Sequence, residues 1–92
     1  MRYSELLKQS IKREKLTLNE ISERLDEFGR KTNKIYISKL QNGKLPPASD
    51  NLNDALAKIL NIDPIDLMAA AYLEKIPVKV LQRIISKERK EA

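Results

Sequence analysis

Apolar residues recur along most of the chain at the three- and four-residue spacing of one-sided α-helices. Near the N-terminus they are Leu6, Leu7 and Ile11, and Ile21 and Leu25 follow. Side chains three or four positions apart share one face of a helix, so each set predicts a helix that buries one side. A longer stripe of the same kind comprises Leu52, Leu56, Ile59 and Leu60. The pattern predicts an all-α chain.

Residues that begin and end helices frame these stripes. Thr17 and Glu20 match a capping box, in which each side chain bonds the other residue's backbone N–H. Gly29 is expected to take a positive φ and turn the chain after the second helix, and Phe28 beside it to fill the core. Residues with a capping role elsewhere are Ser4, Asn33, Gly43, Ser49, Asn61 and the pair Asp63-Pro64. The expected helices are 4–15, 17–27, 33–42 and 49–61, a fifth from residue 63, and a sixth over 78–90.

The stretch from Asn33 to Lys44 predicts a helix of about nine residues with an unusual surface. Ile37 and Leu40 share one face, which is expected to pack against the core, while basic and polar residues occupy the other faces. A short helix of this kind suits insertion into the major groove of DNA.

Charge is concentrated in the same part of the chain. The net charge of the 92 residues is +5; residues 1–45 hold 11 Lys and Arg against six Asp and Glu, whereas residues 46–92 hold seven of each. Five basic residues and no acid lie between Arg30 and Lys44. A basic patch attracts polyanions through counterion release. The alternative interpretation is an ordinary solvated surface.

Composition argues against several function classes. The chain has no Cys and no His, which removes disulfides, the commonest metal ligand and the usual general base. No pair of carboxylates stands in an apolar setting, so we expect no enzyme, no metal and no cofactor. No apolar run approaches the roughly 18 residues of a membrane span, and the first residues are too polar for a signal peptide. We expect a cytoplasmic protein that makes no membrane contact.

Two segments resemble a known DNA-binding family. Thr17-Leu18-Asn19-Glu20-Ile21-Ser22-Glu23-Arg24-Leu25 and Ile37-Ser38-Lys39-Leu40-Gln41-Asn42-Gly43-Lys44 are similar to the helix-turn-helix of the phage repressor and Cro (XRE-like) class. The similarity continues through Pro46-Pro47 to Asp63 and covers roughly residues 4–68. The turn is about five residues longer than the family's compact pattern. Leu18 stands where the family often has a phosphate-binding Gln, and Gln41 where Glu is common.

The resemblance implies a five-helix lambda-repressor-like helix-turn-helix domain in residues 1–75. It implies a sequence-specific double-stranded DNA-binding transcriptional regulator, a repressor of phage or mobile-element type. Asn33, Lys34, Ile35 and Lys39 would face the groove, with lysines donating to guanine and Ile35 touching a thymine methyl. Asn42, Gly43 and Lys44 would occupy the place where the family uses backbone N–H groups and a Lys to hold a phosphate. The DNA-binding candidates are Thr17, Arg30, Lys31, Asn33, Lys34, Ile35, Tyr36, Ser38, Lys39, Asn42 and Lys44.

Some of these roles have alternatives. Tyr36 either donates a hydrogen bond to a phosphate or packs its ring against the protein. The role of Ser38 likewise stays open between a contact with DNA and a contact within the protein. Arg30 and Lys31 lie on the extended turn, from which they would reach the DNA backbone or a minor groove. The fifth helix is expected to bury Leu67, Met68, Ala71 and Tyr72.

Residues 76–92 form a C-terminal sixth helix and tail beyond the domain. The apolar face of this helix, Val80, Leu81, Ile84 and Ile85, either closes over the core or pairs with another chain. Binding two half-sites calls for a dimer, so we expect a homodimer through this helix. A different class of function is a protein-interaction module or an antitoxin that keeps the helix-turn-helix frame, with a regulatory protein as its partner.

Overall fold

The computed structural model describes the backbone of residues 1–91 and the side chains of residues 1–87. Six α-helices make up most of this part of the chain: α1 Tyr3–Glu14, α2 Leu18–Glu27, α3 Lys34–Gln41, α4 Asp50–Leu60, α5 Pro64–Lys75 and α6 Val78–Glu91. Residues 1–91 contain no strand, which confirms the all-α expectation. Helix boundaries agree with the sequence pattern to within one or two residues.

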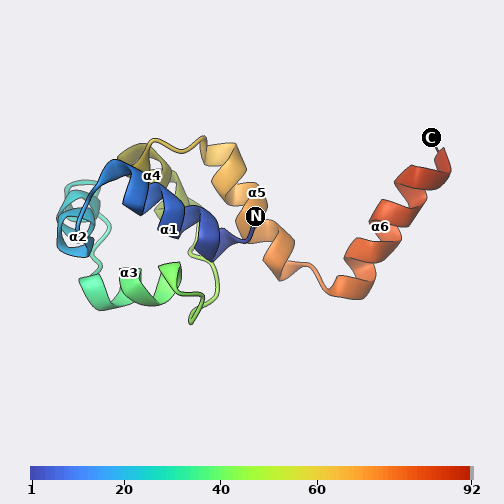
Figure 1. Ribbon diagram of the computed structural model, residues 1–92, viewed down its shortest axis with the longest axis horizontal. Helices are drawn as coiled ribbons and strands as arrows, with labels where there is room; N and C mark the ends of the chain where they lie inside the picture. Colours follow the sequence, from blue (N-terminus) through green and yellow to red (C-terminus); the bar gives the residue numbers. More distant parts are fainter. Residues whose placement is uncertain (92) are drawn as a thin grey trace.

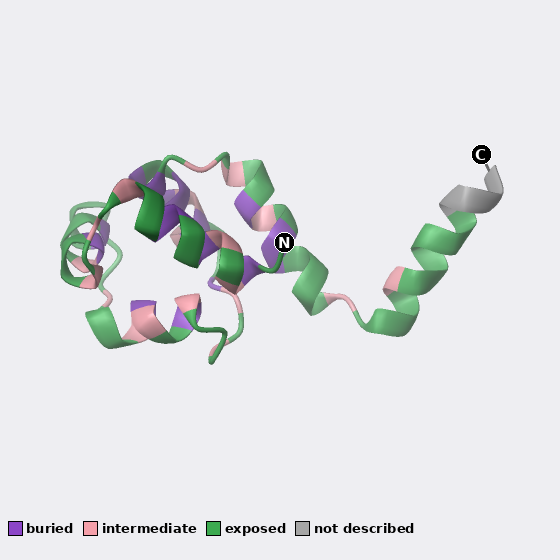
Figure 2. Cartoon of the chain, viewed as in Figure 1, coloured by how far each residue is buried: buried purple, intermediate pink, exposed green. Residues whose placement is uncertain are grey.

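Helices α1 to α5 pack around one aliphatic core, and α3 lies along one side of this body against α1 and α2 (Figure 1). The expected stripes supply most of the buried side chains, whereas Leu6 and Leu52 are only partly buried (Figure 2). The largest fully buried side chains are Tyr3, Leu7, Ile21, Leu25, Ile37, Leu40, Leu56, Leu60, Leu67, Asn53 and Ser10. The sixth helix extends away from the body, and the molecule measures 47 × 23 × 22 Å.

Most helix ends form as the sequence predicts. The capping box is complete, since Glu20 N–H donates to Thr17 Oγ1 at 3.1 Å and Thr17 N–H donates to Glu20 Oε1 at 3.1 Å. Ser49 and Asp63 cap α4 and α5, and Asn61 ends α4 with a left-handed φ of 54°. These contacts span only a few residues, which is why local sequence reveals them.

Three expectations about individual side chains are wrong. Ser4 does not cap the first helix, because α1 begins at Tyr3 and Arg2 stands at the N-cap without a side-chain bond. Phe28 is 47% exposed instead of filling the core, because it is the residue that ends α2, and Lys58 Nζ lies 6.0 Å from its ring centroid. Tyr72 is also 47% exposed and donates to Asp50 Oδ2 at 2.6 Å, while Leu67 and Ala71 are buried as expected.

A buried polar cluster joins α1, the loop before α4 and α4 itself. Tyr3 Oη donates to Asn53 Oδ1 at 2.5 Å, and Asn53 Nδ2 donates to the Ala48 carbonyl at 2.9 Å. The Ala48 N–H donates to Tyr3 Oη at 3.4 Å. Burial raises the pKa of the Tyr3 hydroxyl, which therefore stays protonated and able to donate. The cluster satisfies its own polar groups and holds the loop that follows α3 against the core.

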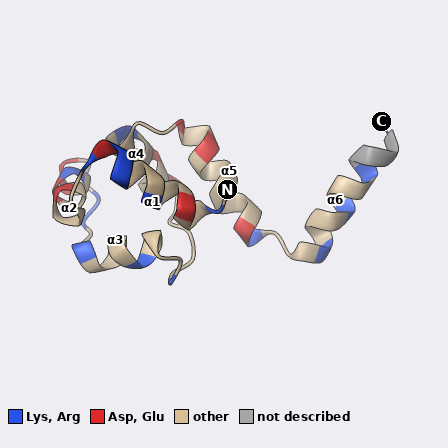
Figure 3. Ribbon diagram, viewed as in Figure 1, with Lys and Arg blue, Asp and Glu red and all other residues tan. Residues whose placement is uncertain are grey.

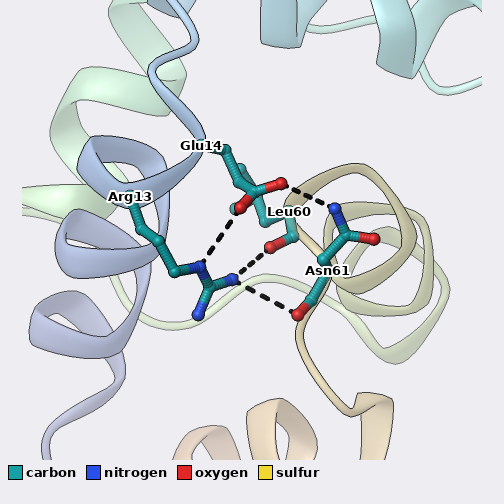
Figure 4. A network of polar contacts seen from close by, with 4 residues as sticks. All are labelled: Arg13, Glu14, Leu60 and Asn61. Atoms are coloured by element: carbon teal, nitrogen blue, oxygen red, sulfur yellow. Dashed lines mark hydrogen bonds and ion pairs between the residues drawn. The ribbon is translucent and has the colours of Figure 1, made fainter.

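A second polar network closes the C-terminus of α4 (Figure 4). Arg13 Nη2 donates to the Leu60 carbonyl at 2.5 Å and to the Asn61 carbonyl at 3.2 Å, which neutralises the negative end of the helix. Asn61 Nδ2 donates to Glu14 Oε1 at 2.6 Å. The hydrogen bonds from Asn61 and then from Arg13 lower the pKa of the Glu14 carboxyl. The network ties the end of α1 to the end of α4.

Replacement of Asn53 is expected to show how much the buried cluster contributes to the free energy of unfolding. Asn53→Ala removes the acceptor of the buried Tyr3 O–H and the side-chain donor to the Ala48 carbonyl, so unfolding in urea should show a loss of about 1–3 kcal/mol. Asn51→Ala, at an exposed position of the same helix, is the matched control and should change stability by less than about 0.5 kcal/mol. Equal losses for the two variants would contradict the assignment.

Asn61→Gly is expected to raise the pKa of the Glu14 carboxyl. Glycine accepts the left-handed backbone of this position but removes the amide that donates to Glu14 Oε1. NMR titration of the Glu side chains measures the change. The pKa of Glu20, lowered by its bonds to Thr17, serves as the internal control and should not move.

Candidate nucleic-acid interface

Helix α3 is anchored by one face and exposed on the other. Asn33 Oδ1 accepts a hydrogen bond from the Tyr36 N–H at 2.9 Å, which begins the helix as its sequence predicts. Ile37 and Leu40 are each 1% exposed and attach the helix to the body. Ile35, on another face, is 61% exposed. The helix therefore presents its non-core side chains outward from a fixed backbone.

The start of α3 is fixed despite the long turn that precedes it. Gly29, with a φ of 75°, donates its N–H to the Asp26 carbonyl, and Arg30 N–H donates to the Leu25 carbonyl, each at 2.9 Å. These two bonds form a Schellman motif at the end of α2. Further along the turn, Ser22 Oγ donates to the Thr32 carbonyl at 2.8 Å. The Schellman motif and the Ser22–Thr32 hydrogen bond thus hold the long turn against α2.

A second Schellman motif ends α3. Gly43, with a φ of 70°, donates its N–H to the Leu40 carbonyl at 3.2 Å, and Lys44 N–H donates to the Lys39 carbonyl at 2.9 Å. The Asn42 N–H donates to the Ser38 carbonyl at 3.1 Å. All three backbone N–H groups expected to hold a phosphate are thus used inside the protein. At this end of the helix, the Lys44 ammonium remains as the cationic group for that contact.

Six of the predicted residues line one shallow groove of about 420 Å³ beside α3. Three of its lining residues are lysines, and none is an acid. Figure 3 likewise shows basic but no acidic positions along α3. The lining residues are Leu18, Lys34, Ile35, Ser38, Lys39, Asn42 and Lys44. Three lysines and the exposed Ile35 therefore line the same space.

Other predicted residues lie outside this groove. Lys31, Asn33 and Tyr36 line a second hollow of about 380 Å³ with Thr32 and Leu52. Tyr36 packs against the core, and partial burial raises the pKa of its hydroxyl. Of its two expected roles, packing is therefore present, and a phosphate contact remains a prediction. Arg30 is exposed at the end of α2 and lines neither hollow.

Thr17 forms the capping box at the start of α2, and its contact with DNA stays a prediction. Its N–H and hydroxyl oxygen are both occupied by Glu20. Hydrogen bonding from Thr17 lowers the pKa of the Glu20 carboxyl, which therefore stays ionised. A phosphate that approached Thr17 would meet this negative charge.

The structure adds two residues that sequence reasoning missed. Leu18, which stands where the family often has a phosphate-binding Gln, lines the groove. Lys8 Nζ, on α1, donates to Asn42 Oδ1 at 3.3 Å and brings a further cation to the end of α3. Lys8 and Asn42 are 34 positions apart, so no local pattern could pair them.

Comparisons with protein-family models, curated proteins and solved structures find no match for this chain. The resemblance in Thr17–Leu25 and Ile37–Lys44 therefore stays a prediction. Among the helices that the structure describes, none combines the length and apolarity that crossing a bilayer requires.

Gly43→Ala should destabilise the protein more than Gly29→Ala. Both glycines have a positive φ, and an L-residue there costs about 1–2 kcal/mol. A Cβ at Gly43 would also lie 3.3 Å from Ser4 Oγ, whereas one at Gly29 meets nothing within 4 Å. Urea unfolding of the two variants measures the difference. An equal or larger loss for Gly29→Ala would contradict the close approach of α1 to the end of α3.

Proposed function

We propose that this protein is a sequence-specific double-stranded DNA-binding transcriptional regulator, acting as a repressor of phage or mobile-element type. In this proposal α2 and α3 form a lambda-repressor-like helix-turn-helix, and α3 enters the major groove. The observation that carries the proposal is the gathering of Lys34, Lys39 and Lys44 in one groove that no acid lines.

The dimensions and chemistry of α3 support this role. An α-helix with its side chains is about 10–12 Å across, which fits the roughly 12 Å width of the major groove, and α3 has eight residues. Lys34 and Lys39 donate to guanine O6 and N7, and Ile35 contacts a thymine methyl. Buried Ile37 and Leu40 keep the backbone in place, which limits the ordering cost of binding.

Contacts to phosphates would set the position of α3 along the duplex. Lys44 lies at the C-terminal end of the groove, and Arg30 and Lys31 lie on the turn before α3. A homodimer would place two copies of α3 on half-sites about 34 Å apart, so the operator would be palindromic. Such a complex represses by covering a promoter.

A protein-interaction module or antitoxin is the second candidate. Leu18 and the exposed Ile35 give the groove an apolar part, which a protein ligand would also use. Capture of a stoichiometric protein partner in a pull-down, with no duplex retained, favours this second function.

Selection of bound duplexes from a random pool at near-physiological salt tests the proposal. A preferred, palindromic sequence is expected. Lys34→Ala and Lys39→Ala should each weaken binding to it by about 1–3 kcal/mol and relax the preference at one base pair. Lys44→Ala should weaken binding to all duplexes alike. It should also reduce the salt dependence of the binding constant by the equivalent of about one phosphate contact.

Lys58→Ala is the control, because Lys58 lies on α4 outside the groove and pairs with Asp54 at 3.2 Å. It should leave affinity and preference unchanged. If no sequence is preferred, and Lys34→Ala and Lys39→Ala weaken every duplex equally, the sequence-specific regulator is ruled out.

A further inference from the structure

Exposed apolar side chains gather at one end of the molecule. Of the ten exposed large hydrophobic residues in the described part of the chain, seven lie on α5 and α6. They are Ile65, Tyr72, Leu73, Val78, Val80, Ile84 and Ile85. A gathering of this kind marks a surface that another molecule covers.

Helix α5 is apolar on two opposite sides. Its inner side buries Leu67, Ala70 and Ala71. Its outer side repeats at helical spacing and reaches the linker after the helix: Ile65, Ala69, Tyr72, Leu73 and Ile76. We call this set the outer stripe of α5. An apolar side of a helix is normally covered by another element, and nothing in the described part of the chain covers the outer stripe.

Helix α6 has an apolar side that the body does not cover. Leu81 is partly buried, while Val80, Ile84 and Ile85 are between 42% and 49% exposed. Ile76 is extended, with a ψ of 126°, because the following Pro77 disfavours the helical conformation. This break ends α5 and directs α6 away from the body (Figure 1).

Charge separates the two surfaces. The neutral second half of the sequence divides at the end of α5 into residues 46–75, with five acids and two bases, and residues 76–92, with two acids and five bases. At the edge of the outer stripe, Tyr72 donates to Asp50 Oδ2, and Lys75 Nζ lies 5.3 Å from the Tyr72 ring centroid. The excess of acids therefore belongs to the α4–α5 region as a whole. The described side chains of α6 include Lys79, Arg83 and Lys87 and no acid (Figure 3). Two copies of α6 would repel each other, whereas α6 and the α4–α5 region attract.

We infer that α6 of one copy docks on the outer stripe of α5 in a second copy, and reciprocally, to form a symmetric dimer. The lengths match, since α6 spans about 21 Å and α5 about 18 Å. The exchange covers both unpartnered faces at once and closes with two-fold symmetry. The sequence predicted a homodimer through α6 without naming the surface that it contacts. In this arrangement that surface is the outer stripe of α5.

Two charged substitutions in the full-length chain test this arrangement by sedimentation without DNA, so the result is independent of the proposed function. Leu73→Asp breaks the outer stripe and Ile84→Asp breaks the apolar side of α6. Each should raise the dimer dissociation constant at least about tenfold. Phe28→Asp is the control, because Phe28 is exposed to a similar extent but lies on neither surface. Circular dichroism checks that each variant is folded.

Mixing the two weakened variants gives the decisive measurement. In the mixed dimer, unchanged α6 of the Leu73→Asp chain meets the unchanged outer stripe of the Ile84→Asp chain, so one of the two contacts is intact. Fluorescence transfer between labelled variants should therefore show association stronger than in either variant alone. Normal dimerisation of Leu73→Asp with loss in Ile84→Asp would mean that α6 pairs with itself and would overturn the inference. A monomeric wild-type chain, or no recovery on mixing, would overturn it too.

Discussion

The hydrogen-bonded cluster of Tyr3, Asn53 and Ala48 is the constraint on which the arrangement of the other helices depends. It joins the first helix, the loop after α3 and the start of α4 inside the core. Hydrogen bonds in such a place are directional and costly to leave unmade, so they select one position of the loop among several that apolar packing would accept. This loop begins where the Schellman motif at Gly43 ends α3.

Helix α3 is consequently held at both ends and along one side. Ser22 and Thr32 close the turn before it, the Schellman motif at Gly43 closes its end, and Ile37 and Leu40 hold its inner face. Its outer face is then free to carry charge. The proposed DNA contact uses this face, whereas the proposed assembly surface lies on α5 and α6. The two surfaces are built from different helices, so DNA binding and self-association do not compete for the same side chains.

Sequence reasoning was most successful where the physics is local. The capping box at Thr17, the positive φ of Gly29 and the six helices each follow from contacts between residues a few positions apart. Reasoning failed for Phe28, expected to fill the core from the turn, and for Tyr72, expected on the buried face of the fifth helix. Each lies at a point where the helix turns its side chain outward, to Lys58 in one case and to Asp50 in the other. Six of the predicted DNA-binding residues line one groove, because helical spacing puts those on α3 on neighbouring faces and Asn42 and Lys44 follow directly at its end. Asn33, expected to face the same groove, lines another hollow.

By itself the sequence determined the helices, the one-sided burial of α3 and the basic character of its outer face, because helical spacing and capping act over about four residues. Only the tertiary structure decided that Leu18 completes the groove and that Lys8 reaches Asn42. It also decided that the N–H groups at Gly43 and Lys44 are used within the protein and that α6 extends from the body with its apolar side uncovered. These features depend on contacts between distant segments. Such contacts form only when the whole core packs, and helical periodicity does not encode them.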